Sequence, residues 1–198
     1  MITIIDYGCG NLRSIQKSFE RFYPIVVITS DLETIEQAKG VILPGVGSFG
    51  DAVKELKDNK LFDFMKRMIR TVPTIGICLG MQLLFSNSEE SLGIEGLDII
   101  HGKVIRIKPK GNITVPHTGW NRLISDSKTS FHGYAYFNHS YYCCPNDEEL
   151  ILSYVNHGVS IPAIIIKDHI IGIQFHPEKS KNTGENIIKY FISLLGGH

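Results

Sequence analysis

A cysteine at the end of an apolar run is the first group in this sequence that could do covalent chemistry. In TIGICLGMQLLF, residues 74–85, Cys78 follows a strand-like segment, precedes a helix-like one and lies between Gly76 and Gly80. Small neighbours permit the sharp strand-to-helix turn that exposes a nucleophile, and the N-terminus of the following helix stabilises a thiolate. Free cysteines are also commonly buried as small apolar side chains. The local pattern nevertheless favours a nucleophilic Cys78.

A cysteine nucleophile needs a base, and GIQFHPEKS, residues 172–180, supplies one at the end of another strand-like segment. Pro177 favours an extended backbone at His176. Alternate residues of an extended segment point to the same side, so Glu178 can lie beside the imidazole. Taken alone, this stretch is equally typical of a solvated turn. With Cys78 it predicts a triad in which His176 is the base and Glu178 fixes its tautomer and stabilises its cation.

A tetrahedral intermediate on Cys78 would need hydrogen-bond donors for its oxyanion. The backbone N–H of Leu79 is one candidate, because it directly follows the nucleophile. The loop PGVGSFG, residues 44–50, offers a second at Val46 or Gly47, since Gly45 and Gly47 allow backbone conformations that other residues resist. A glycine-rich loop by itself is often only a turn.

The elements that must position these groups alternate between strand and helix in the first half of the chain. We expect strands at 2–6, 25–29, 40–44 and 74–78, helices at 11–22, 50–71 and 80–85, and a short polar helical segment at 31–39. This order predicts a parallel sheet with helices on both faces and chemistry at the carboxyl ends of its strands. The loops YGCGN, PGVGSFG and CLGMQ would meet there.

The second half of the chain is rich in strand-like runs. They lie at 98–107, 117–124, 134–143, 150–155, 162–167 and 169–175, ahead of a closing helix at 184–195. We expect this half to be antiparallel in part. No repeat or low-complexity linker separates the halves, so residues 1–198 are expected to form one domain.

Composition excludes several classes of function. Lys plus Arg and Asp plus Glu each number 20, so no attraction to nucleic acid or anionic lipid is expected. The sequence begins without a basic leader, and its longest apolar tract is interrupted by Lys167 and Asp168, so we expect a cytoplasmic protein. The cysteines and histidines show no metal-binding spacing. Arg13 stands where a dinucleotide fingerprint needs its third glycine, and no cofactor is predicted.

Taken together, the motifs resemble those of the class I glutamine amidotransferases, which carry GxCxGMQ and HPE. Here these read GICLGMQ at 76–82 and HPE at 176–178. Over nearly the whole chain, DYGCGNL, LPGVGSFGDA, VPHTGWN, NHSYY and GIQFHPEKS are similar to the glutaminase subunits that serve imidazole glycerol phosphate synthases in histidine biosynthesis. The resemblance implies an α/β, flavodoxin-like fold with a mixed, mostly parallel sheet flanked by helices and a strand-rich C-terminal half.

The resemblance also implies a reaction and a partner. Glutamine would be hydrolysed, and its ammonia passed to a separate (β/α)8-barrel synthase subunit in a heterodimer. Residues expected to hold L-glutamine are Gln82, Ser140, Tyr141 and the backbone at Gly45 and Gly47. Residues expected at or near the synthase interface are Tyr7, Asn11, Trp120, Asn121 and Lys179. Taken singly, Trp120 and Tyr141 are as typical of core packing, and Lys179 of a solvated charge.

Two positions depart from the family pattern. Thr118 replaces the methionine usual in PHMGWN, and Asn138 stands where an apolar residue commonly precedes HSYY. Both lie near the expected interface, so a paralogous glutaminase that feeds a synthase-like partner aminating a sugar for surface glycans is an alternative. A non-catalytic regulatory subunit and a cysteine hydrolase acting on peptides or small electrophiles are alternatives of other classes.

Overall fold

The first half of the chain alternates strands and helices in the order that the sequence predicts. The computed structural model describes residues 1–108, 113–125 and 131–196. The elements of the first half are β1 (Ile2–Ile5), α1 (Leu12–Glu20), β2 (Val26–Thr29), α2 (Leu32–Glu36), β3 (Gly40–Leu43), α3 (Phe49–Asp58), α4 (Leu61–Met68), β4 (Thr74–Ile77) and α5 (Leu79–Leu83).

The second half consists mainly of strands and ends in a long helix. Its elements are β5 (Phe85–Ser88), β6 (Ile100–Arg106), β7 (His117–Ser125), β8 (Tyr134–His139), β9 (Tyr141–Pro145), β10 (Ile151–Asn156), β11 (Ser160–Lys167), β12 (Ile170–Ile173) and α6 (Lys181–Leu194), with 3₁₀ turns η1 (Glu148–Leu150) and η2 (Pro177–Lys179).

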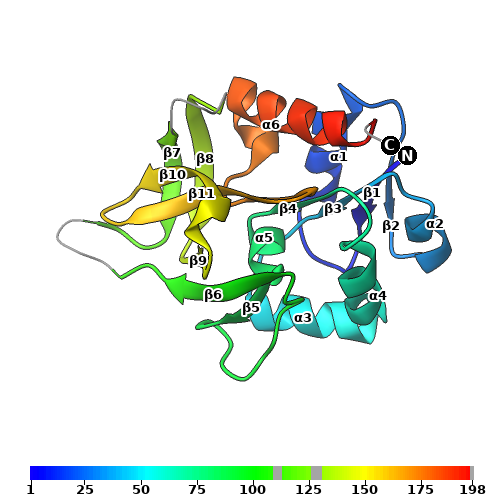
Figure 1. Cartoon of the computed structure of the whole chain (residues 1–198), viewed down its shortest axis with the longest axis horizontal. Helices are drawn as coiled ribbons and strands as arrows, with labels where there is room; N and C mark the ends of the chain where they lie inside the picture. Colours follow the sequence, from blue (N-terminus) through cyan, green and yellow to red (C-terminus); the bar gives the residue numbers. More distant parts are fainter. Residues whose placement is uncertain (109–112, 126–130, 197–198) are drawn as a thin grey trace.

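Within the described ranges, nine strands form one large mixed sheet in the order β2-β1-β3-β4-β12-β11-β10-β7-β8. Pairing is parallel from β2 through β12 and antiparallel from β12 to β8. Strands β5, β6 and β9 form a smaller second sheet beside it (Figure 1). The predicted mixed α/β fold is confirmed, with parallel pairing ending at β12 instead of running through most of the large sheet.

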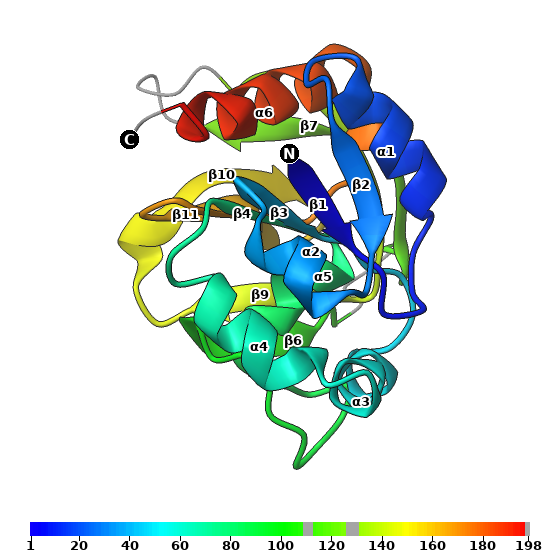
Figure 2. The same cartoon turned by 90° about the vertical axis from the view of Figure 1, so that its right-hand side faces the viewer.

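Helices cover both faces of the parallel strands, with α1 and α6 on one side and α2 to α5 on the other (Figure 2). Alternate residues of these strands pack into two separate hydrophobic cores, because successive side chains of a strand point to opposite faces of the sheet. Ile4 and Ile42 pack in the cluster that contains Phe19 of α1, whereas Ile5 and Val41 pack in the cluster that contains α3 and α4. The parallel strands are therefore buried on both faces, which explains their continuous apolar runs.

The helix predicted over 50–71 is divided into α3 and α4. Lys60 adopts a left-handed conformation with φ 60° and precedes α4, while Asn59 caps the end of α3. A left-handed residue interrupts the helical hydrogen-bond pattern and redirects the chain. The helix predicted over 80–85 likewise ends early, because fully buried Phe85 begins the unpredicted strand β5.

The strand predicted over 134–143 is also divided, and the break at Ser140 shapes the site described below. Residues of β8 pair with β7 in the large sheet, whereas those of β9 pair with β6 in the small one. The Ser140 carbonyl accepts a 2.9 Å hydrogen bond from the Ile107 N–H at the end of β6. Ser140 is therefore a corner where the chain passes from one sheet to the other.

None of the helices in the described ranges is both long and apolar enough to cross a lipid bilayer.

Candidate active site

Cys78 occupies a tight turn between β4 and α5, with φ 53° and ψ −106°. Such a conformation costs a residue with a side chain about 1–3 kcal/mol. Its glycine neighbours are required by space, since a Cβ on Gly80 would lie 1.9 Å from the Leu43 carbonyl oxygen and one on Gly76 would lie 2.8 Å from the Gly80 carbonyl oxygen. The predicted strand–turn–helix arrangement around Cys78 is present.

His176 follows β12, the strand that pairs in parallel with β4. Its Nδ1 lies 3.1 Å from Oε1 of Glu178, and the two side chains are only 7% and 4% exposed. His176 is extended, with φ −94° and ψ 104°, but Glu178 lies in the 3₁₀ turn η2. The turn therefore brings the carboxylate back to the imidazole, rather than the strand alternation that the sequence suggested.

The Cys78 sulfur and the Glu178 carboxylate both contact the His176 imidazole. Burial alone would lower the pKa of His176, but these two partners outweigh it and raise that pKa to about 10. The imidazole is therefore held as a cation at neutral pH, beside the sulfur. An imidazolium in this position can donate a proton to a leaving group.

Gln174 is a neighbour of Cys78 that the sequence analysis did not single out. Its side-chain Nε2 lies 3.7 Å from the Cys78 Sγ, and the residue is fully buried. The alternation that the sequence analysis used to place Glu178 beside His176 could also have identified Gln174, because Gln174 lies two residues before His176 in the same segment.

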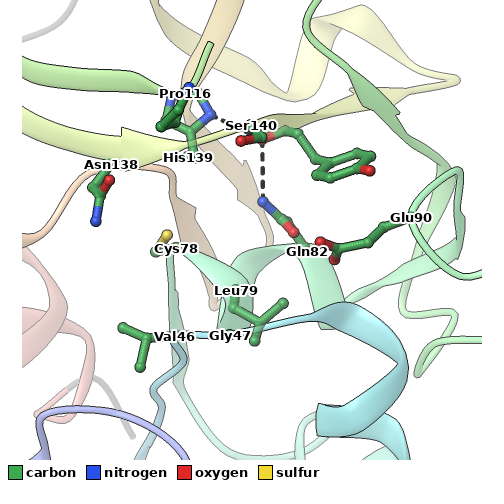
Figure 3. A pocket seen from close by; sticks show the side chains of 11 residues that line it. Val46, Gly47, Cys78, Leu79, Gln82, Glu90, Pro116, Asn138, His139 and Ser140 are labelled. Atoms are coloured by element: carbon green, nitrogen blue, oxygen red, sulfur yellow. Dashed lines mark hydrogen bonds between the residues drawn. The ribbon is translucent and has the colours of Figure 1, made fainter.

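A pocket of about 250 Å³ opens beside Cys78, whose sulfur points into it (Figure 3). Most residues predicted for the oxyanion and for glutamine line it together, although they come from separate parts of the chain. They are Val46, Gly47, Leu79, Gln82, Ser140 and Tyr141. The loop after β3, the start of α5 and the Ser140 corner therefore form a single pocket.

Gly45, predicted to hold glutamine, lies behind the pocket wall instead of lining it. A Cβ there would be 2.6 Å from the Leu79 Cβ and 2.8 Å from the Gly80 N. Gly45 therefore lets the loop pack against the Cys78 turn. Gly47 has φ +111° and no atom within 4 Å of a Cβ placed on it, so its backbone conformation, not lack of space, favours glycine.

Four pocket residues were not predicted as site residues: Glu90, Pro116 and His139, and Asn138, which the sequence analysis named only as a departure from the family pattern. Glu90 is the acidic side chain among the lining residues. Its Oε2 accepts a 2.7 Å hydrogen bond from the Phe49 N–H, and among the residues that the structure describes no hydrogen bond to its Oε1 is seen. No local motif marked Glu90, because only the loop after β5 brings it to the pocket.

The residues predicted for a partner interface differ in their exposure to solvent. Asn11 and Lys179 are exposed, and Trp120 is 49% exposed. Asn121 is half-buried and its side chain binds Asn156 and His117 within the protein.

Tyr7, by contrast, is 1% exposed, and its hydroxyl donates to the Pro44 carbonyl. The structure therefore corrects the prediction for Tyr7, which supports the loop after β3 from inside the core.

Within the described ranges, no group of three or more His, Cys, Asp or Glu side chains is arranged to hold a metal ion. The chemistry that this site supports is attack by a cysteine on an electrophilic carbon, with a histidine cation beside the sulfur and an adjacent carboxylate to stabilise that cation.

Comparison with known proteins agrees with this geometry. The family model described as glutamine amidotransferase class-I matches residues 3–194. The chain is 41% identical to the imidazole glycerol phosphate synthase subunit HisH of Geobacillus thermodenitrificans, covering 100% of this chain and 97% of that protein. It is 46% identical to the subunit of the same name from Methanocaldococcus jannaschii, covering 98% and 100%.

Solved structures share the fold at low sequence identity. A crystal structure of a glutamine amidotransferase aligns with a TM-score of 0.79 at 16% identity, covering 99% of this chain and 100% of the other. The structure of PurLQS from Thermotoga maritima aligns with a TM-score of 0.70 at 17% identity, covering 98% of each chain. These similarities extend the architecture of Figure 1 to proteins with very different sequences.

The charge state of His176 gives a direct test of the geometry. We expect its imidazole to remain doubly protonated from pH 6 to pH 8.5 in ¹H–¹⁵N spectra, because its pKa is raised from 6.5 to about 10. Glu178→Gln and Cys78→Ala should each lower the titration midpoint. The stability that this cation contributes should be complete below about pH 6.5 and be lost as the pH rises through about 10. A neutral imidazole at pH 8 in the unmodified protein would contradict the arrangement.

Proposed function

The chain belongs to the class I glutamine amidotransferase family, and from this membership we propose that it is the glutaminase subunit of an imidazole glycerol phosphate synthase, hydrolysing glutamine for histidine biosynthesis. The observation that carries the proposal is the strained Cys78 turn, which lies beside the buried His176–Glu178 pair at the wall of a pocket. The full-length similarity to HisH subunits supports the pathway.

In the proposed reaction, the Cys78 sulfur attacks the side-chain amide carbon of glutamine. His176 donates its proton to the amide nitrogen, the C–N bond breaks, and ammonia leaves a γ-glutamyl thioester. A water molecule then gives a proton to His176 and attacks the thioester carbon. The C–S bond breaks to release glutamate and the sulfur. Glu178 stabilises the His176 cation and orients its ring throughout.

We propose that the pocket binds glutamine through backbone N–H donors, polar side chains and one carboxylate. The Leu79 N–H at the start of α5 would stabilise the oxyanion, joined by an N–H at Val46 or Gly47. Gln82, Ser140 and Tyr141 would hold the polar atoms of the amino acid. The free carboxylate oxygen of Glu90 would pair with the α-ammonium group, which is the cation that an amino-acid substrate brings. Gly45 then acts only by close packing.

Ammonia needs protection after release, because in neutral water most of it becomes protonated and is no longer nucleophilic. The chain is expected to deliver it to a synthase partner, which we propose is a (β/α)8-barrel subunit in a heterodimer. The exposed residues Asn11, Trp120 and Lys179 would contact it. We further propose that residues 1–198 act as one domain, which a family model spanning residues 3–194 supports, and that the protein is cytoplasmic.

Substitution of the nucleophile tests the enzyme assignment. Cys78→Ala should reduce glutamine-dependent turnover of the complete complex to background, whereas turnover with added ammonium salts should remain. Cys144→Ala is the matched control, because Cys144 is a partly exposed free thiol outside the pocket. A glutamine-analogue electrophile should label Cys78 alone, as read by peptide mass. Labelling nowhere, with no effect of Cys78→Ala, would instead indicate a non-catalytic regulatory subunit.

The acceptor of the ammonia can be tested genetically. The departures from the family pattern, Thr118 and Asn138, are cross-strand neighbours joined by a 3.1 Å hydrogen bond, and Asn138 lines the pocket. They act as a matched polar pair and leave the triad untouched. We therefore expect this gene to rescue a histidine auxotroph that lacks its glutaminase subunit. Failure despite intact glutaminase chemistry would favour the sugar-aminating alternative.

We also expect partner binding to control the rate. The Val46–Gly47 peptide is our candidate for a group that changes orientation on partner binding. Val46 is 47% exposed and Gly47 has open space around it, whereas Gly45 is tightly packed. If this peptide turns its N–H toward Cys78 only in the complex, the isolated chain lacks one oxyanion donor and should be about 10²- to 10³-fold slower. Steady-state rates at saturating glutamine, with and without partner and acceptor, measure this ratio.

Trp120→Ala should weaken the acceleration, with Leu92→Ala as the control, because Leu92 is an 87% exposed apolar side chain on the loop after β5. Equal rates for the isolated chain and the complex would falsify the coupling.

A further inference from the structure

A row of hydrogen bonds connects β7 to the wall of the glutamine pocket. Asn121 Nδ2 lies 3.3 Å from Nε2 of His117, and Nδ1 of His117 lies 3.1 Å from Nε2 of His139. Nδ1 of His139 lies 2.8 Å from the Tyr141 carbonyl oxygen. The same oxygen accepts a 3.2 Å hydrogen bond from Gln82 Nε2, and both bonds to it are drawn in Figure 3.

The chemistry of the end groups fixes the direction of every bond in this row. A carbonyl oxygen only accepts, so His139 must carry its proton on Nδ1 and leave Nε2 bare. The bare Nε2 only accepts, so His117 must donate from its own Nδ1. The Nε2 of His117 is then bare and accepts from the amide of Asn121. One tautomer of each histidine is therefore compatible with the row.

Both imidazoles are held neutral, as this pattern requires. Burial and the neighbouring histidine His157 lower the pKa of His117 to about 4. Burial also lowers the pKa of His139 to about 3, and the nearby histidines, His176 among them, oppose its protonation. Each neutral imidazole carries one N–H. A further proton on either ring would occupy the nitrogen that must accept a hydrogen bond in this row.

The rings have little freedom to turn. His117 is stacked between Phe137, with centroids 4.8 Å apart, and His157, with centroids 4.1 Å apart. His157 is itself held by a 2.8 Å contact from its Nε2 to the Thr114 carbonyl. His117 and His139 face each other in register across β7 and β8. The packing therefore maintains the bond geometry.

The far end of the row is anchored to the backbone. Asn121 Nδ2 also donates to the Asn156 carbonyl at 2.9 Å, and its Oδ1 accepts from the Arg122 N–H at 2.8 Å. These bonds determine which end of the amide faces His117. The side chain predicted to contact a partner is thus used inside the protein.

We propose that Asn121, His117 and His139 are positioning residues, which together fix the Tyr141 carbonyl and the Gln82 side chain for the binding of glutamine. The inference rests on the proposed function, because it takes glutamine as the ligand of this pocket. None of the three residues reaches the triad by a hydrogen bond within the described ranges. The effect of their loss should therefore fall on KM for glutamine more than on kcat.

The first test compares two substitutions of His139 in the complete complex. His139→Phe keeps an aromatic ring but removes the donor to Tyr141, and KM for glutamine should rise about tenfold. His139→Asn can place its amide N–H where Nδ1 was, and KM should stay within about threefold of the unmodified value. An unchanged KM for His139→Phe, or kcat losses equal in both variants with a shared loss of thermal stability, would overturn the proposal.

The second test reverses the polarity at the start of the row. Asn121→Asp replaces the donor with an acceptor, so His117 should gain a proton on Nε2 and KM for glutamine should rise. Asn87→Asp, at an exposed position of β5, is the matched control for the change of charge. An Asn121→Asp variant in which both the KM for glutamine and the His117 tautomer are unaltered would contradict this row of hydrogen bonds.

Imidazole ¹H–¹⁵N spectra of the unmodified protein give a readout that does not require activity. Both His117 and His139 should show the Nδ1–H tautomer, which is the less common form of free histidine. Finding the Nε2–H tautomer at His139 would overturn the proposed row of hydrogen bonds even if the glutaminase assignment holds. The Nδ1–H tautomers in a protein that lacks glutaminase activity would support the bond pattern and refute the proposed function separately.

Discussion

The close approach of the Cys78 turn to the end of β3 is the constraint on which the rest of the site depends. Gly80 lies so near the Leu43 carbonyl that no side chain fits between them. The same approach brings Leu79 against Gly45, so the nucleophile and the glycine-rich loop are held as one unit. Backbone strain at Cys78 is maintained by this packing, since nothing in the residue itself favours φ 53°.

Parallel pairing of β4 with β12 supplies the second half of the arrangement. Ile77 is in register with Ile173, so the residues that follow these two strands emerge at the same edge of the sheet. Cys78 emerges from one strand, and Gln174 and His176 from the other. The triad is thus a consequence of strand order, with the η2 turn needed only to return Glu178 to the imidazole. Chemistry at the carboxyl ends of parallel strands is the general rule for such sheets.

The opposite wall of the pocket has a different origin. Ser140 is the point where the chain leaves the large sheet for the small one, and this corner places the Tyr141 carbonyl oxygen within hydrogen-bond distance of both His139 and Gln82. The wall is made from neutral side chains and backbone carbonyls, while the triad side carries the imidazolium. A pocket that opens beside Cys78 and has a fixed polar wall opposite the sulfur suits the polar substrate proposed for it.

The sequence by itself determined the alternation of strands and helices, the glycines around Cys78 and the identity of the triad candidates, because these depend on residues close together in the chain. It also predicted most residues that line the pocket, with Leu79, Val46 and Gly47 coming from the local sequence and Gln82, Ser140 and Tyr141 from a family resemblance. Tertiary structure decided what depends on distant segments.

The burial of Tyr7, the division of residues 134–143 between two sheets, and the presence of Glu90 and His139 in the pocket all follow from such contacts. No local pattern in the sequence encodes which strands of the fold will become neighbours. For the same reason, the polar row from Asn121 to Tyr141 became visible only when β7 and β8 were paired, since each histidine alone resembles any other buried polar side chain.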